Sequence, residues 1–354
     1  MKKISLFILV AMMGLVNMHA RTTDKQYIVA GVAFYNVENL FDTINTNGRY
    51  DLEFSPEGLK MWNSEKYWKK MHNLARAITA MVTPETPVGP AVIGISEVEN
   101  ESVVADLVRT VDEELIKEGK EPWNLKYVHH DSPDLRGIDV ALLYNPLFFA
   151  VENVVPHRLL IPDEPEFRTR DQLCVTGSLL DEPTAFIVNH WPSRLGGEKE
   201  SSPMREAAGR LSKSIADSLW RVNPEMSVMM MGDLNDDPFN KSCAKAFGAK
   251  KDVKETAHHG FYNPFWRILD AGVGTLCYKG EWNLFDQIMV SGNLVDGSNP
   301  NFLYWKATVH NKPFLRTRTG VYKNYPHRTF SSNNFLNGYS DHFPTEIFLL
   351  KAVD

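Results

Sequence analysis

The sequence predicts an α/β (α+β) domain, in which short buried strands form sheets and amphipathic helices cover them. Short apolar, β-rich runs recur along the chain, and longer stretches between them have the 3.6-residue periodicity of amphipathic helices. Strands that first alternate with helices and then follow one another directly fit a layered domain better than a helical bundle or an all-β barrel.

The expected strands are runs rich in valine, isoleucine, leucine, phenylalanine and methionine. They lie at residues 27–35, 91–95, 140–144, 173–179, 185–188, 227–231, 285–290 and 346–350. The expected helices lie at 62–82, where Leu74 and Ile78 share one face, and at 204–222.

The N-terminus has the pattern of a secretory signal peptide. Lys2 and Lys3 precede an apolar run, and a small residue, Ala20, stands before a polar stretch. The run of about thirteen residues is shorter than the roughly twenty that span a membrane. We therefore expect cleavage after residue 20, a secreted or periplasmic mature chain, and no transmembrane segment within it.

Composition narrows the function further. No repeat or linker divides residues 21–354, which predicts a single domain and, by default, a monomer. The net charge of −6 becomes two units more negative when Lys2 and Lys3 are removed, and this balance disfavours nonspecific binding to long nucleic acids. The three cysteines lack metal-ligand spacing and are interpreted as structural.

Polar side chains follow several of the expected strands at the point where each strand ends. A solitary Asn or Asp there is usually a turn residue or a cap, whereas loops at strand ends also commonly carry functional sites. Asp286 stands between apolar residues and should need a polar partner. In chain order the residues are Asn36, Glu97, Asp139, His190, Asp233, Asn235, Asp286, Asp341 and His342. Such a series within one domain predicts a shared site.

In this order, the motifs at 232–235 and 340–342 and the strand ends at Asn36 and Glu97 resemble the endonuclease/exonuclease/phosphatase superfamily. The resemblance covers nearly the whole mature chain, and the segments at 35–39 and 190–194 are similar to a bacterial extracellular branch. It implies a deoxyribonuclease-I-like, four-layer sandwich of two mixed β-sheets flanked by helices. It also implies a metal-dependent phosphoric ester hydrolase with its site at one end of the sandwich.

The resemblance implies a role for each strand-end residue. Glu97 would be the principal metal ligand, with Asn36 and Asp341 close by. His342 would pair with Asp286 and His190 with Asp139, while Asp233 and Asn235 would hold the attacking water and the phosphate. The proton for the leaving oxygen would come from His190 or from a water on the metal.

Mg²⁺ is the implied cofactor, with Mn²⁺ and Ca²⁺ as alternatives. Because Mg²⁺ prefers oxygen ligands and keeps several waters, one or two carboxylates together with the substrate phosphate form a sufficient site. Arg170, Arg194 and Arg136 are candidates for binding the phosphate, since a guanidinium matches phosphate oxygens. The alternative for each arginine is a solvated surface charge.

The substrate remains open between two classes. A phosphodiesterase would cut DNA, RNA or another diester, whereas a phosphomonoesterase or lipid or inositol-phosphate phosphoesterase would use the same residues. Glu99 stands where DNA-cutting relatives often have Lys or Arg, which weakens the DNA interpretation, although the segment at 97–100 also resembles extracellular nucleases. A catalytically silent binding protein is disfavoured because every expected catalytic residue type is present.

Overall fold

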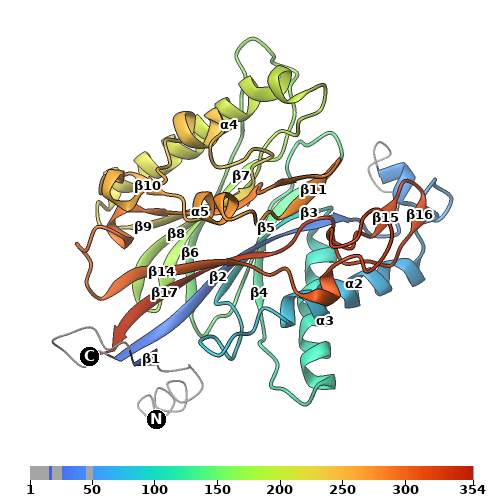
Figure 1. The fold of residues 1–354 in the computed structure, drawn as a ribbon, viewed down its shortest axis with the longest axis horizontal. Coiled ribbons are helices and arrows are strands. Elements are labelled where there is room, and N and C mark those ends of the chain that lie inside the picture. The colour runs from blue at the N-terminus through green and yellow to red at the C-terminus, as the bar shows by residue number, and fades with distance from the viewer. Residues whose placement is uncertain (1–15, 18–25, 45–50, 354) are drawn as a thin grey trace.

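The computed structural model describes residues 16–17, 26–44 and 51–353 (Figure 1). The predicted signal peptide, residues 1–20, lies outside this part of the chain except for strand β1 (Val16–Asn17), which pairs with the next strand. Among the helices within the described ranges, none has the length and apolar character needed to cross a membrane.

The first sheet has seven strands in the order β14-β17-β2-β3-β5-β4, with β1 added beside β2. Strands β2 and β3 run parallel, and the other neighbours run antiparallel. The strands are β2 (Gln26–Leu40), β3 (Val92–Val98), β4 (Lys126–His129), β5 (Asp139–Tyr144), β14 (Phe302–Val309) and β17 (Thr345–Val353).

The second sheet repeats this plan with six strands in the order β10-β13-β9-β8-β7-β6. Its one parallel pair, β8 and β9, again lies inside the sheet. The strands are β6 (Phe149–His157), β7 (Gln172–Leu179), β8 (Glu182–His190), β9 (Ser227–Asp233), β10 (Phe261–Tyr262) and β13 (Asp286–Ser291).

Helices cover the two sheets and complete the layers (Figure 1). Helices α2 (Ser64–Thr79) and α3 (Glu101–Lys117) share a core with the first sheet, and α4 (Glu198–Val222) packs on the second. Alternation along β9 shows the layering, because Met229 and Met231 belong to the core that includes the first sheet, whereas Met230 belongs to the core under α4.

The remaining elements are short. They are α5 (Phe265–Asp270), the hairpins β11 (Leu276–Tyr278) with β12 (Glu281–Asn283) and β15 (Phe330–Ser331) with β16 (Asn334–Phe335), a π-helical turn at Ser242–Phe247, and 3-10 turns at Asp51–Phe54, Val253–Glu255, Gly292–Leu294 and Pro313–Leu315.

The predicted four-layer α/β sandwich is therefore confirmed, and every predicted strand and helix falls on an observed one. The structure adds strands β4, β6, β10 and β14, which all lie at sheet edges. Strands β4 and β6 are only partly buried and lack a continuous apolar run, β10 has two residues, and β14 begins with an apolar run but is not among the expected strands. The structure also adds α3, for which Asn100 is the N-cap.

Candidate active site

The two parallel strand pairs bring most of the predicted residues to one end of the sandwich. Asn36 on β2 lies opposite the residue before Glu97 on β3, and His190 on β8 lies opposite Asp233 on β9. Asp233 also lies opposite Asp286 on β13. Because β2 contacts β9 and β3 contacts β8 across the two sheets, these strand ends meet in one place.

Hydrogen bonds link the two sheets at this point. Asn36 Nδ2 donates to Asp233 Oδ2 at 2.9 Å and lies 3.4 Å from Glu97 Oε1. His190 Nε2 lies 3.6 Å from Asp233 Oδ2 and 3.9 Å from Glu97 Oε1. All four side chains are buried, so the carboxylates and the imidazole share a small space with little water.

His342 completes the cluster from the loop that leads into β17. Its Nδ1 lies 2.7 Å from Asp286 Oδ2, which is the contact expected from the sequence. Its Nε2 lies 3.8 Å from Asp233 Oδ2, so the free edge of the ring faces the same space as His190. Asp233 therefore lies between the two histidines.

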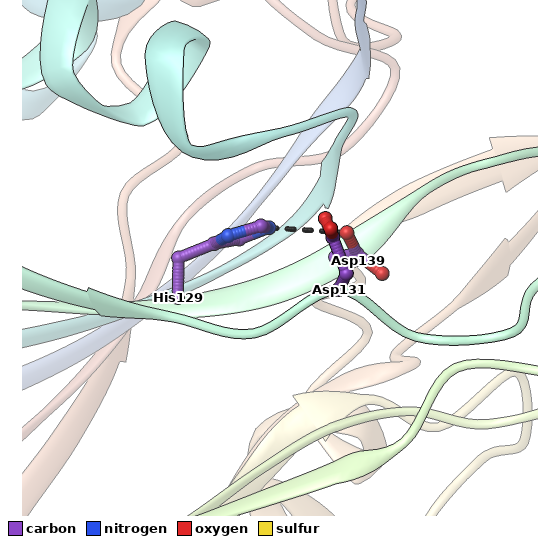
Figure 2. A group of neighbouring side chains, drawn as sticks. All are labelled: His129, Asp131 and Asp139. Carbon is purple, nitrogen blue, oxygen red and sulfur yellow. Dashed lines mark hydrogen bonds and ion pairs between the residues drawn. The ribbon is translucent and has the colours of Figure 1, made fainter. Parts of the chain in front are cut away.

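The expected contact between His190 and Asp139 is not formed. Asp139 instead accepts from Ser132 and lies 3.0 Å from His129 Nε2, and Figure 2 shows the His129 ring directed at the carboxylates of Asp131 and Asp139. The physical reason is register, because edge strand β4 places His129 beside the start of β5 within the same sheet. His190 Nδ1 is buried and has no hydrogen-bond partner.

The two histidines of the cluster differ in charge state. Burial by itself would lower the pKa of His342, but the carboxylates of Asp286 and Asp233 outweigh it and raise this pKa well above the ordinary value. Burial, reinforced by Arg170 and Arg136, lowers the pKa of His190 well below the ordinary value. Near neutral pH the site thus holds one imidazolium and one neutral imidazole, and groups whose pKa values diverge in this way are suited to acid–base chemistry.

Asp233 has the pKa of a useful base. Burial raises its pKa to about 6; the positive charge of His342 opposes this rise, and the neighbouring Asp286 adds to it. A carboxylate with a pKa near 6 is ionised above that pH and holds a proton more readily than an ordinary aspartate.

Unusual backbone conformations cluster at the same place. Glu38, Asn39, Glu97 and Asn235 all have positive φ angles, between 50° and 68°. Glu97 lies at an irregularity in the pairing of β3 with β5, which redirects a side chain that a regular strand would place elsewhere. Eight other non-glycine residues of the described ranges also have a positive φ, and asparagine tolerates it, so Glu38 and Glu97 are the informative residues; strain of this kind is common at functional sites.

Two of the three predicted phosphate-binding arginines are already engaged in the fold. Arg170 is buried and donates to the carbonyl oxygens of His190 and Trp191 and to Asp134 Oδ2. Arg194 lies over the ring of Phe285 at 4.5 Å and donates to the carbonyl oxygen of Asn235. These contacts hold the loops that carry His190 and Asn235, and a role of either arginine in binding the phosphate stays a prediction.

Arg136 remains available to a substrate. Its side chain is 42% exposed and lies 3.7 Å from Glu97 Oε2, where it also contacts Asn39 Oδ1. Asn235 directs its amide Nδ2 to the Trp191 carbonyl oxygen at 3.0 Å, and its backbone N–H donates to Asp233 Oδ1. In the structure, Asn235 therefore orients Asp233.

A charged network that the sequence did not reveal surrounds Asp341. Arg328 Nη2 contacts Asp341 Oδ2 at 2.8 Å and its Nε lies 3.6 Å from Glu38 Oε1. Behind Glu38, the fully buried Lys70 donates to Thr329 Oγ1. Only weak features of the sequence point to this network. Arg328 lies in a generally basic stretch, and Lys70 stands on the apolar face of α2, one turn from Leu74.

The oxygen-rich side chains at the site fit a hard divalent cation. Glu97 and Asn36 contact each other, whereas Asp341 lies 4.0 Å from His342 Nε2 and pairs with Arg328. Asn36 Oδ1 accepts the backbone N–H of Glu38 and Glu97 Oε2 accepts that of Asn39, so Glu97 is the clearer ligand because it carries a negative charge. Two other groups bring possible ligand atoms within 4.8 Å of one another: Asp233, Asp286 and His342, and the His129 group of Figure 2.

A deep cluster of carboxylates and histidines at the end of a two-sheet sandwich defines a metal-dependent phosphoester hydrolase. The sequence matches the endonuclease/exonuclease/phosphatase family over residues 31–351, and the chain belongs to this family.

Solved structures share the fold at low sequence identity. TDP2 from Caenorhabditis elegans, in a truncated form, is 15% identical with a TM-score of 0.52, covering 92% of this chain and 98% of that one. A mannosyl-6-phosphatase of Bacteroides thetaiotaomicron is 16% identical with a TM-score of 0.52 (92% and 100%). ANGEL2, described as a 2′,3′-cyclic phosphatase, is 11% identical with a TM-score of 0.57 (94% and 99%). A search of curated proteins found no match.

Proposed function

We propose that this chain is an exported, Mg²⁺-dependent phosphodiesterase that hydrolyses a P–O ester bond by attack of water. The observation that carries the proposal is the position of Asp233 within 3.8 Å of two histidines whose pKa values are shifted in opposite directions. Buried groups with strongly shifted pKa values that also converge in space are characteristic of active sites.

A divalent cation held by Glu97, with Asn36 and Asp341 beside it, would neutralise charge on the phosphate. The rest of the chemistry falls to side chains of the chain itself. Asp233, with its pKa of about 6, orients the attacking water and takes its proton as the new P–O bond forms and the ester P–O bond breaks, and the leaving oxygen takes a proton from solvent water. The imidazolium of His342, fixed by Asp286, faces the phosphate and balances its negative charge.

His190 contributes as a neutral ring. Its Nε2 lies between the carboxylates of Asp233 and Glu97, and Arg170 fixes the backbone on either side by binding the carbonyl oxygens of His190 and Trp191. This places a hydrogen-bond donor or acceptor beside the phosphate without adding a second positive charge.

Several basic residues of the C-terminal part are paired within the fold, whereas Arg318 and Lys323 are exposed. Lys306 pairs with Glu85, Lys312 donates to the Ala80 carbonyl oxygen, and Arg316 donates to the Asn311 carbonyl oxygen. Cations that are paired within the fold release few counterions when a nucleic acid arrives. We therefore favour a small diester over duplex DNA.

A phosphomonoesterase is the second candidate, and one observation favours it. Arg136 beside Glu97 and Arg328 beside Asp341 are both partly exposed, with 42% and 50% of their side chains accessible. A terminal phosphate carries more negative charge than a diester, so it would bind more favourably to the two guanidinium groups.

Parallel assays separate these candidates. The chain without residues 1–20 is given bis-p-nitrophenyl phosphate, p-nitrophenyl phosphate and plasmid DNA with Mg²⁺, and each assay is repeated with EDTA. EDTA-sensitive cleavage of the diester supports the proposal, and cleavage of the monoester alone moves the chain to the second candidate. No metal-dependent turnover of any of the three would contradict a phosphoesterase of either kind.

Export is supported by the sequence pattern at residues 1–20. Expression of the full chain in a Gram-negative host and mass measurement of the periplasmic product tests it. A product that begins at Arg21 supports export, and an uncleaved chain confined to the cytoplasm contradicts it.

A further inference from the structure

A cavity of about 370 Å³ adjoins the catalytic cluster. One wall is the β11–β12 hairpin with Tyr278, and the other is the segment between β14 and β17, with Tyr322 and Tyr325. Arg328 and Asp341 also line the cavity, and Asp341 lies 4.0 Å from His342. The cavity is therefore continuous with the place where the phosphate would lie. In Figure 1, β11 and the β15–β16 hairpin lie at the same end of the molecule.

The tyrosine rings lining the cavity are packed against other aromatic rings in part and are largely exposed in part. The rings of Tyr322 and Tyr325 lie 5.6 Å apart, and Tyr325 packs edge-on against Trp282 at 5.9 Å. Yet Tyr322 is 59% exposed and Tyr278 is 64% exposed. Large aromatic rings held in place beside a cavity, with much of their surface in water, are suited to stacking on a flat ligand.

The charges in the cavity select the kind of ligand. Lys279 Nζ lies 5.2 Å from the centre of the Tyr278 ring, and Arg328 lies at the end nearest the catalytic cluster. A cationic group such as a quaternary ammonium would compete with Lys279 for the aromatic face and would be repelled. A neutral ring attached to a phosphate meets no such repulsion.

Two other large cavities have a less suitable charge. One of about 710 Å³ is lined by three arginines and four carboxylates, and one of about 480 Å³ by one arginine and four carboxylates. In the tyrosine-lined cavity the two cations, Lys279 and Arg328, outnumber the one carboxylate, Asp341, which favours a phosphate ester. At about 370 Å³, the tyrosine-lined cavity falls within the usual range of about 300–1,000 Å³ for small-molecule sites and exceeds what a phosphate alone needs.

We propose that this cavity binds the organic group of the substrate, and that this group is a nucleoside whose base stacks on Tyr322. The substrate class is then a phosphate ester of a single nucleoside, with the phosphate near Asp341 and the base between the two tyrosine-bearing segments. The assignment rests on the proposed function, because it takes the cluster at Asp233 as the place of the phosphate.

Binding measurements test this inference without depending on turnover. In the His342→Ala background with Mg²⁺, which prevents hydrolysis, calorimetry is used to compare thymidine 5′-monophosphate, ribose 5-phosphate and methyl phosphate. We expect the nucleotide to bind at least about fivefold more tightly than the other two, since stacking of one base is worth about that much or more. Tyr322→Ala should remove this preference and leave methyl phosphate binding unchanged, whereas Tyr322→Phe should keep it.

Equal binding of the three ligands, or a preference that survives Tyr322→Ala, would overturn the inference. Tight binding of ribose 5-phosphate as well would overturn the assignment of a base. Thermal unfolding of each variant excludes misfolding as the cause of a lost preference. The binding measurements are also repeated on Tyr278→Ala, a variant of the opposite wall of the cavity. Hydrolysis of bis-p-nitrophenyl phosphate by the parent chain reports separately on the proposed function, so nucleotide binding without hydrolysis would contradict that function alone.

Discussion

Two buried histidine–carboxylate pairs in this molecule look alike and differ in what surrounds them. His342 lies 2.7 Å from Asp286, and His310 lies 2.6 Å from Glu346. Both carboxylates are fully buried, and both histidines are nearly so. The nearest-neighbour geometry alone would therefore assign both pairs the same role.

Their surroundings separate them. The free Nε2 of His342 faces Asp233 and Asp341 at 3.8 and 4.0 Å. Glu346 instead packs so closely on the backbone that a Cβ atom on Gly31 would lie 2.1 Å from its Oε1. One pair opens onto further carboxylates, whereas the other is enclosed by the sheet and has lysines nearby. The convergence of further carboxylates therefore marks the site, and the pair alone does not.

The largest expected effect comes from the carboxylate that best fits a metal ligand. Glu97→Gln keeps the shape of the side chain but removes the charge that holds the cation, and we expect kcat/KM to fall by about a thousandfold or more. Steady-state kinetics with a Mg²⁺ titration measures this. A variant that keeps parental activity at parental Mg²⁺ concentration would remove Glu97 from the metal site.

The second-largest effect is expected at Asp286, and the same type of substitution at Glu346 is the comparison. Asp286→Asn leaves His342 without the charge that holds it as an imidazolium, and we expect kcat to fall by about a hundredfold or more. The matched Glu346→Gln variant should keep kcat within about twofold. Equal losses in the two variants would show that the surroundings do not distinguish the pairs.

A substitution at Arg170 tests whether its buried side chain stabilises the fold or binds the substrate. Arg170→Leu leaves Asp134 without its partner, and loss of one member of a buried ion pair costs about 3 kcal/mol or more in free energy of unfolding. Urea denaturation measures the loss. A fully stable variant with a raised KM would instead restore Arg170 as a phosphate-binding residue.

The smallest expected effect is a pH dependence of the structural pair. Burial raises the pKa of Glu346 above its ordinary 4.5, and His310 and the nearby lysines only partly oppose this. The folded state thus favours the protonated carboxyl, so this contribution to stability is full below pH 4.5 and is lost as the pH rises through the raised pKa. The unfolding free energy of Glu346→Gln relative to the parent should therefore improve as the pH rises. A difference that is constant with pH would contradict the assignment.

Much of this architecture could be predicted because central strands and strand-end residues leave clear patterns. The apolar runs predicted the strands β8 and β9, and the polar residues directly after these runs located His190 and Asp233, but the parallel pairing of the two strands is a finding of the structure. The edge strands β4 and β6 could not be found in this way, since they are half exposed and less apolar.

The contact between His190 and Asp139 is implied by the family resemblance, and the structure does not form it. Strand β4, which is not among the expected strands, places His129 beside Asp139 instead. The network of Arg328, Glu38 and Lys70 was unpredictable for a related reason, because its members come from segments more than thirty residues apart that meet only in the folded domain. Patterns along a chain indicate which residues are polar at strand ends, whereas their partners depend on tertiary packing.

The most direct test of the account compares His342→Ala with His310→Ala in the same assay. We expect His342→Ala to lose at least about a hundredfold in kcat for bis-p-nitrophenyl phosphate with Mg²⁺ while its Tm stays near that of the parent. His310→Ala should keep the parental kcat and unfold at a lower temperature. If His310→Ala loses activity as severely as His342→Ala while both remain folded, the catalytic cluster has been assigned to the wrong place.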